Sequence, residues 1–115
     1  MKATQILSSI LAAAALMAAS AAVQASAPVD GAAATALAQR SACMACHAVD
    51  RRMVGPSYRD IATKYRGMDV AKLAASIRAG GSGKWGPVPM PAQPNLSEDN
   101  ARILAAWVLA GAPAR

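Results

Sequence analysis

The chain has 115 residues, enough for one domain at most, and carries a formal net charge of +6. Its basic residues are scattered along the sequence rather than clustered into a stripe, which argues against a nucleic-acid-binding protein and suits a protein that meets acidic partners transiently. It contains no Phe, two Trp and two Tyr. A domain of this size with so few large apolar side chains usually needs a disulfide, a metal or a cofactor for stability.

The start of the chain, residues 1–25, has the pattern of a secretory signal peptide. Lys2 provides a basic start, an Ala-rich apolar run covers residues 6–23, and a small-residue cleavage pattern ends at Ala25. An uncleaved membrane anchor is the alternative, because the run approaches the length of about 20 residues that a spanning helix needs. Strongly apolar residues are few in it. We therefore expect cleavage, export to the periplasm, and a mature domain of residues 26–115 without stable membrane insertion.

The mature domain is predicted to be all-α, with about four short helices and no convincing strand. The segments with a helical pattern are residues 32–41, residues 58–66, residues 70–79 and the stretch between Ser97 and Gly111. Asp69 and Ser97 are favourable N-caps for the last two of them. These helices alone leave the domain short of apolar core material.

Two segments interrupt the helical pattern and are expected to be loops. The Gly55-Pro56 pair is a typical loop sequence. Residues 84–96, "KWGPVPMPAQPNL", contain four of the seven prolines of the chain and show no helical period. Because proline fixes its own φ, this second loop should have restricted flexibility.

Both cysteines and the only histidine lie in five consecutive positions, Cys43-Met44-Ala45-Cys46-His47. A structural disulfide between Cys43 and Cys46 would close a very short loop and stabilise little. A thioredoxin-like redox pair would need a βαβ setting, which the helical pattern does not offer. A structural zinc site normally takes four protein ligands, whereas only three Cys or His residues exist here.

The spacing C-x-x-C-H is also the attachment sequence of covalent haem c. Positions i and i+3 share one face of a helical turn, so Cys43 and Cys46 can both reach the two vinyl groups on one edge of the porphyrin. His47 can then approach the iron from the same side. A haem would supply the apolar bulk that the core lacks. We therefore predict one haem c, bound through two thioethers.

The sixth position of the haem iron separates an electron carrier from a ligand-binding protein, because an axial methionine fills it and an open site binds gases or peroxide. Met44 lies inside the attachment motif and cannot easily reach the opposite haem face. Met53 and Met68 flank a short helical segment and are interpreted as gap-fillers. Met90 stands in the proline-stiffened loop, which can hold its thioether against the iron. A methionine packed on the core is the alternative interpretation of Met90.

These segments together resemble a short bacterial class I cytochrome c, the small His/Met type of the periplasm. The resemblance extends over about residues 33–110 and rests on "CMACH", "VGPSYRDIATKY", "IRAGGSGKWGPVPMP" and "NARILAAWVLAG" in that order. It implies a cytochrome c-like all-α bundle of about four short helices wrapped around one covalently bound haem.

The resemblance also implies a role for each site residue. Thioether bonds would form at Cys43 and Cys46, and His47 and Met90 would be the axial iron ligands. The residues implied to support them are Pro56, whose carbonyl would accept from the other ring nitrogen of the histidine, and Trp85, whose indole N–H would contact a haem propionate.

One part of the sequence departs from the family pattern. The family often has "MPPN" at the ligand methionine, with the asparagine near the thioether sulfur, whereas this chain has "MPAQPN". Gln93 takes the spacing of that asparagine, and Asn95 lies two residues further on. The sequence leaves open which of the two contacts the sulfur of Met90.

The resemblance implies a one-electron carrier and not an enzyme. The expected partners are redox proteins: a donor such as a membrane cytochrome complex, and an acceptor such as a nitrite reductase or terminal oxidase. The chain is expected to act as a monomer and not to bind nucleic acid. A haem enzyme or sensor with an open iron site is the alternative, and it requires Met90 to be off the iron. A dedicated subunit of a larger enzyme stays possible with identical haem chemistry.

Overall fold

The computed structural model describes residues 28–115, so the predicted signal peptide, residues 1–25, lies outside the described residues. The elements are α1 (Gly31–Arg40), the short 3₁₀ helix η1 (Cys43–Ala45), α2 (Tyr58–Lys64), α3 (Val70–Ala79) and α4 (Glu98–Leu109). No strand occurs within 28–115, and the sole extended pairing there is one antiparallel bridge between Gly81 and Met90. The prediction of an all-α domain with four helices is confirmed.

Each of the four α-helices begins at a residue whose side chain accepts a hydrogen bond from a backbone N–H of the first turn. The N-caps are Asp30, Ser57, Asp69 and Ser97. A side-chain oxygen at this position satisfies a backbone donor that the helix itself leaves unpaired. Local sequence therefore fixes where every α-helix starts.

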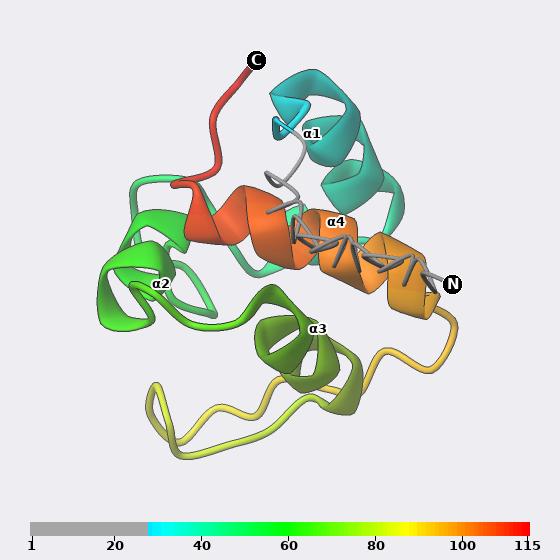
Figure 1. Cartoon of the computed structure of the whole chain (residues 1–115). Helices are drawn as coiled ribbons and strands as arrows, with labels where there is room; N and C mark the ends of the chain where they lie inside the picture. The colour runs from blue at the N-terminus through cyan, green and yellow to red at the C-terminus, as the bar shows by residue number, and fades with distance from the viewer. Residues whose placement is uncertain (1–27) are drawn as a thin grey trace, which may run out of the picture.

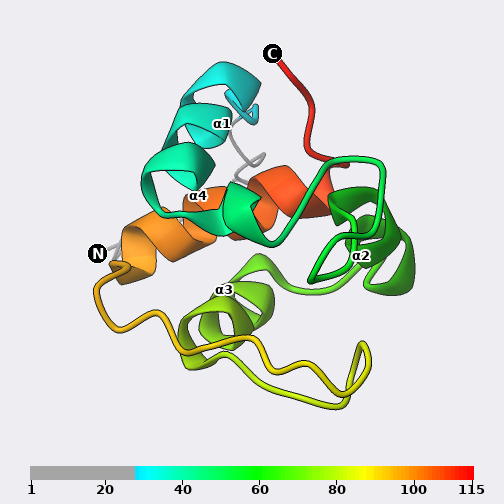
Figure 2. The ribbon, with the colours of Figure 1, turned by 180° about the vertical axis from the view of Figure 1, so that it is seen from behind.

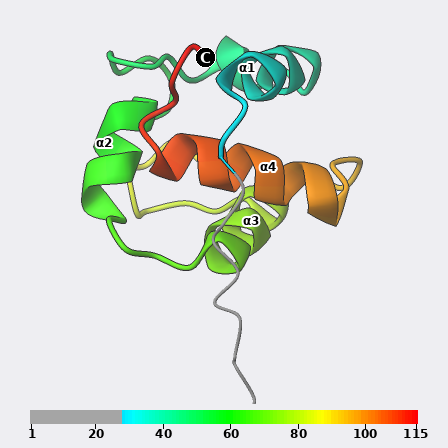
Figure 3. The ribbon, with the colours of Figure 1, turned by 45° about the horizontal axis from the view of Figure 1, so that its top comes forward.

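Helix α4 is the centre of the fold and packs against α1, α2 and α3. Figure 1 shows α1 on one side of α4 and α3 on the other, and the view from behind in Figure 2 shows the same arrangement. Figure 3 shows α1 above α4 and α3 below it. The loop that follows α3 runs beneath α3 before the chain enters α4 (Figure 1).

The buried core is built on α4 but is poor in large side chains. Trp107 of α4 is 1% exposed, lies edge-on to the Tyr58 ring at 5.0 Å, and donates from Nε1 to the Pro113 carbonyl at 2.9 Å. Half of the buried hydrophobic residues are alanines. Alanine lets helices approach closely but contributes little apolar area, so this core is small. None of the helices in the described part of the chain has the length and hydropathy needed to cross a bilayer.

Candidate functional site

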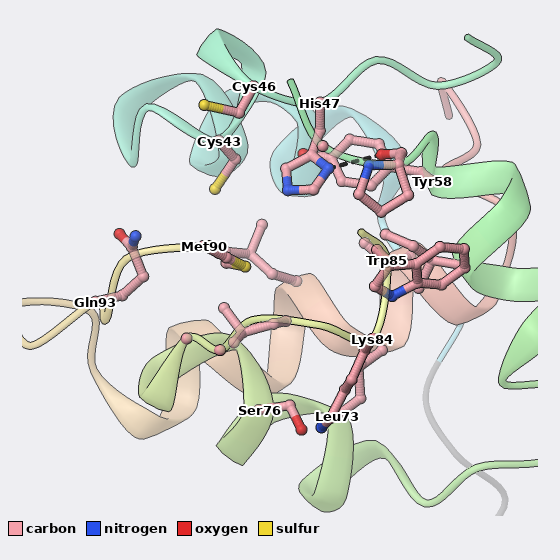
Figure 4. A pocket seen from close by; sticks show the side chains of 18 of the residues that line it. Cys43, Cys46, His47, Tyr58, Leu73, Ser76, Lys84, Trp85, Met90 and Gln93 are labelled. Atoms are coloured by element: carbon pink, nitrogen blue, oxygen red, sulfur yellow. Dashed lines mark hydrogen bonds between the residues drawn. The ribbon is translucent and has the colours of Figure 1, made fainter. Parts of the chain in front are cut away.

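A cavity of about 380 Å³ lies between the Cys43–His47 segment and the loop that follows α3. This volume is within the range of small-molecule and cofactor sites, about 300 to 1,000 Å³. Cys43, Cys46, His47 and Met90 all line the cavity. Figure 4 shows His47 on one side and Met90 on the other, with both cysteine sulfurs along one edge.

The two cysteines are brought to this edge by a tight turn after α1. Ala42 adopts a left-handed conformation with φ of 59°, and it is the N-cap of η1. The N–H groups of Cys46 and His47 then both donate to the Cys43 carbonyl, at 3.2 and 3.1 Å. Both thiols are free and half-buried, and burial raises the pKa of the Cys43 thiol. The turn thus presents two unlinked sulfurs on one side of the cavity.

The imidazole of His47 is held in one orientation by its neighbours. Its Nδ1 lies 2.7 Å from the Pro56 carbonyl oxygen. A carbonyl can only accept, so Nδ1 carries the hydrogen and donates, and Nε2 keeps its lone pair. The His47 ring also stacks on the Tyr58 ring, with centroids 5.3 Å apart and an angle of 23° between the planes. Burial and, secondarily, the nearby Cys43 raise the pKa of the Tyr58 hydroxyl.

Gly55 makes this arrangement of His47 possible. A Cβ atom at position 55 would lie 2.5 Å from Cε1 of the His47 ring. The backbone N–H of Gly55 donates to the Cys46 carbonyl at 2.8 Å, which holds the loop close to the attachment segment. No side chain larger than hydrogen fits between this backbone and the imidazole. The sequence showed Gly55 only as part of a loop, and its contact with the ring was missed.

Met90 faces the cavity from the loop that follows α3. Its backbone N–H donates to the Gly81 carbonyl at 2.8 Å, and its carbonyl accepts from the Gly81 N–H at 3.0 Å. Met53 is 40% exposed and does not line the cavity. Met68 lines it but packs against the buried core, and Met44 lines a separate hollow near the end of α4. Met90 lies across the cavity from His47 (Figure 4).

Trp85 and Gln93 line the same cavity, whereas Asn95 does not. Trp85 is half-buried and lies edge-on to the Tyr65 ring, with centroids 5.9 Å apart. Gln93 donates from Nε2 to the Pro91 carbonyl at 3.1 Å, and its backbone N–H donates to the Arg78 carbonyl at 2.9 Å. Of the two residues that the sequence left as alternatives near Met90, the structure brings Gln93 to the cavity.

The residues around the cavity fit a covalently bound haem. Two free thiols lie along one edge, an imidazole has its Nε2 lone pair available, and a thioether lies on the opposite side. Gly55 leaves room for the ring that would face the iron. No group of three or more His, Cys, Asp or Glu side chains in residues 28–115 could hold a metal ion by itself, so an iron bound here would need the porphyrin as well.

Known proteins with similar sequences are small cytochromes. A sequence model of the family described as "Cytochrome C oxidase, cbb3-type, subunit III" matches residues 30–108. Cytochrome c-551 of Pseudomonas aeruginosa is 50% identical over 76 residues, which are 64% of this chain and 71% of that protein. Cytochrome c-552 of Hydrogenobacter thermophilus is 49% identical over 75 residues, 64% of this chain and 76% of that protein.

The fold is similar to that of solved structures of the same group. The crystal structure of wild-type Nitrosomonas europaea cytochrome c552 superimposes with a TM-score of 0.64 at 44% sequence identity, covering 66% of this chain and 96% of that one. The class 1 cytochrome MtoD of Sideroxydans lithotrophicus gives 0.61 at 30% identity, covering 75% of this chain and all of the other. The chain therefore belongs to the family of small class I monohaem cytochromes c, which carry electrons by means of one covalently attached haem c.

Proposed function

We propose that this protein is a periplasmic one-electron carrier in which Nε2 of His47 and the sulfur of Met90 are the axial ligands of the haem iron. The observation that supports this proposal is the placement of the two side chains on opposite sides of one cavity, with both thiols at its edge (Figure 4). Haem iron supplies the redox centre that gains and loses the electron. The chain's own residues hold the ligands still.

On the histidine side, the Pro56 carbonyl accepts the Nδ1 hydrogen at 2.7 Å. This bond fixes the tautomer and makes Nε2 a better donor to a metal. Tyr58 and Gly55 limit rotation of the ring, because Tyr58 stacks on it and the backbone of Gly55 lies so close that a Cβ atom there would overlap it. A ligand that keeps its position in both oxidation states keeps the reorganisation during electron transfer small.

On the methionine side, the thioether would close the sixth position and raise the reduction potential. The paired backbone hydrogen bonds between Met90 and Gly81 hold the ligand residue at the base of its loop. Prolines on both sides of Met90, Pro89 and Pro91, restrict the backbone further. Gln93 lines the same cavity, and we propose that it takes the position of the family's asparagine near the sulfur of Met90.

Trp85 is proposed to hold a haem propionate. Thioether bonds to Cys43 and Cys46 would use the vinyl edge of the porphyrin, so the propionates would lie at the other end of the pocket. Figure 4 shows Trp85 at the end of the pocket remote from the two thiols. No acceptor within residues 28–115 receives its indole N–H. A half-buried indole needs a partner, and a carboxylate would be a strong one.

The proposed partners are redox proteins that dock transiently: a donor such as a membrane cytochrome complex, and an acceptor such as a nitrite reductase or a terminal oxidase. The family that matches residues 30–108 is named after subunit III of a cbb3-type cytochrome c oxidase, so a role as a subunit of a larger enzyme is kept as the alternative to a free carrier. We propose that the chain works as a monomer and that residues 1–25 direct its export. Gel filtration and the intact mass of the exported haem protein, with Ser26 as its first residue, would check both statements.

The axial ligand is tested by comparing two methionine variants of the haem-loaded protein. Met90→Ala should become high-spin, bind carbon monoxide when reduced, and have a lower reduction potential. Met53→Ala is the matched control, because Met53 is exposed and does not line the cavity. It should keep the low-spin spectrum of the unmodified protein. If the unmodified protein already binds carbon monoxide, the site is open and the proposal of an electron carrier with a methionine ligand is wrong.

A further inference from the structure

The loop between α3 and α4 that carries Met90 has a flexible half and a stiff half. Gly80 and Gly83 in the first half, and Gly86 directly after the tip, each have a positive φ that other residues rarely adopt. The second half contains the prolines of "PVPMP". Lys84 and Trp85 lie at the tip, where the two halves meet. The Gly81–Met90 bridge closes the base of the loop, but it does not fix the tip.

Two basic side chains from earlier in the chain are bonded to consecutive carbonyls at this tip. Arg52 donates from Nη2 to the Trp85 carbonyl at 2.7 Å, and Lys64 donates from Nζ to the Lys84 carbonyl at 2.8 Å. Arg52 belongs to the loop that follows His47, and Lys64 is the last residue of α2. Hydrogen bonds with a charged donor are stronger than neutral ones. These two hydrogen bonds therefore connect the loop that carries Met90 to the loop after His47 and to the end of α2.

Lys64 makes a second contact with the same loop. Its Nζ lies over the Trp85 ring, 4.2 Å from the centroid. The Tyr65 ring meets the Trp85 ring at an angle of 84°. Tryptophan is the aromatic side chain that best attracts a cation to its face. The tip is thus held through its backbone and through the aromatic side chain of Trp85.

Two neighbouring basic residues differ from this pair. Arg51 and Arg66 are exposed and make no hydrogen bond or ion pair with any residue in the described range 28–115. They are ordinary solvent-exposed charges and serve as a comparison for Arg52 and Lys64. Arg52 and Lys64, although exposed themselves, both direct their charge onto one loop.

We propose that Arg52 and Lys64 are positioning residues that keep the sulfur of Met90 on the haem iron. The inference rests on the proposed ligation by His47 and Met90. While Arg52 and Lys64 hold the tip, the flexible part of the loop cannot move away from the haem and displace Met90. Without these two contacts, the loop opens more often, and an external ligand can reach the iron during each opening.

The test measures how often the methionine leaves the iron of the oxidised holoprotein. Cyanide binds ferric haem only while the sixth position is open, so the binding rate at saturating cyanide equals the opening rate. Arg52→Gln and Lys64→Gln should each raise this rate about two- to fivefold, the range expected for losing an exposed cation–π or charged contact. The double variant should raise it about tenfold.

Arg51→Gln and Arg66→Gln are the matched controls, since each removes one positive charge within two residues of the residue it controls for and breaks no contact with the loop. Their rates should stay within twofold of the unmodified protein. Lys64→Arg keeps a cation over the Trp85 ring and should also stay within twofold, which a general loss of stability would not allow.

The outcomes separate this inference from the proposed function. If the unmodified protein binds cyanide slowly and reaches a limiting rate, Met90 ligation stands. If Arg52→Gln and Lys64→Gln bind cyanide at the same rate as the controls, Arg52 and Lys64 do not position Met90, and the inference is wrong. If either variant does not fold with haem, the other variant and Lys64→Arg provide the test. A cyanide-binding rate for Lys64→Arg equal to that of Lys64→Gln would contradict the inference. Immediate cyanide binding by the unmodified protein would instead overturn the proposed function.

Discussion

The environment of His47 depends on a single glycine. Gly55 approaches the imidazole so closely that a Cβ atom would overlap the ring. Pro56, the next residue, supplies the carbonyl that receives Nδ1–H, and Tyr58 supplies the ring that stacks on it. Gly55, Pro56 and Tyr58 thus all contact the His47 ring, and all three also line the cavity. The loop before α2 and the first residue of α2 together orient the imidazole.

Gly55→Ala should therefore destabilise the haem-loaded protein. The added methyl group must displace either the ring or the loop, and such overpacking costs about 1–3 kcal/mol. Urea unfolding of the oxidised holoprotein measures the free energy of unfolding. Gly81→Ala is the control, because a Cβ there meets nothing within 4 Å. Equal stabilities for the two variants would show that His47 has more freedom than its packing indicates.

Ala42 is a second residue under local constraint. Its φ of 59° places a residue with a Cβ in the left-handed region, which is unfavourable by about 1–2 kcal/mol for most residues. Its side chain is exposed and loses no packing on removal. Ala42→Gly relieves the constraint but adds freedom to the unfolded chain, at about 0.4–1 kcal/mol.

We expect Ala42→Gly to raise the free energy of unfolding by about 0.5–1 kcal/mol, the difference between these two effects. The measurement is urea unfolding of the holoprotein. Ala71→Gly, at an exposed position inside α3, is the control and should lower stability by about 1 kcal/mol. A loss of stability in both variants would mean that the turn before Cys43 tolerates alanine without cost.

At the scale of secondary-structure elements, the helices were largely predictable because their determinants are local. The expected helix over 70–79 matches α3, and Asp69 caps it as predicted. The first helix begins one residue earlier than expected because Asp30, which the sequence left in a loose start, caps it. The helix expected over 58–66 ends at Lys64, and the next residue, Tyr65, packs against the Trp85 ring.

Contacts between distant elements were not predictable from the sequence. The bonds from Arg52 and Lys64 to the loop tip join residues 33 and 20 positions apart. No periodicity marks such pairs, because both partners lie in loops or at a helix end. The stack of Tyr58 on His47 was hidden in the same way, since the helical pattern explains Tyr58 as an ordinary apolar residue. The cavity-lining residues Cys43, Cys46, His47 and Met90 could be named because their chemistry is visible in the sequence.

Helix α4 gives the element whose end is most easily tested. The Ser97 hydroxyl accepts from the Asn100 N–H at 3.1 Å. Since α4 packs against the other three helices, fraying of its first turn should affect the whole domain. Ser97→Ala should lower the free energy of unfolding by about 1 kcal/mol in thermal or urea unfolding.

Ser97→Asp is the control for this prediction, because aspartate can accept the same hydrogen bond and its charge favours the N-terminal end of a helix. It should retain the stability of the unmodified protein. If Ser97→Ala is as stable as Ser97→Asp, the cap contributes nothing and the start of α4 is fixed by packing alone.

At the scale of the whole molecule, the cofactor completes the core. Seven of the fourteen buried hydrophobic residues are alanines, and a cavity of about 380 Å³ lies beside them. Without the haem, the apolar side chains that line this cavity would lose packing contacts and would be exposed to water. The polypeptide alone therefore has little to offset the conformational entropy that folding removes.

The double variant Cys43→Ala, Cys46→Ala, which cannot attach haem, should be unfolded or degraded. Circular dichroism of the purified chain measures its helix content, and loss of the helical signal is the expected result. Met44→Ala within the same segment keeps both thiols and should be recovered folded with haem. A stably helical double variant would contradict the argument that the haem is part of the core.

The central claim is that the iron lies between His47 and Met90, and the optical spectrum of the unmodified holoprotein tests it most directly. The spectrum would be recorded oxidised and reduced, with and without carbon monoxide. A low-spin c-type spectrum, a weak far-red sulfur-to-iron band when oxidised, and no response to carbon monoxide are the predicted results. A high-spin spectrum that shifts with carbon monoxide would contradict the account, and the protein would then bind ligands at an open iron.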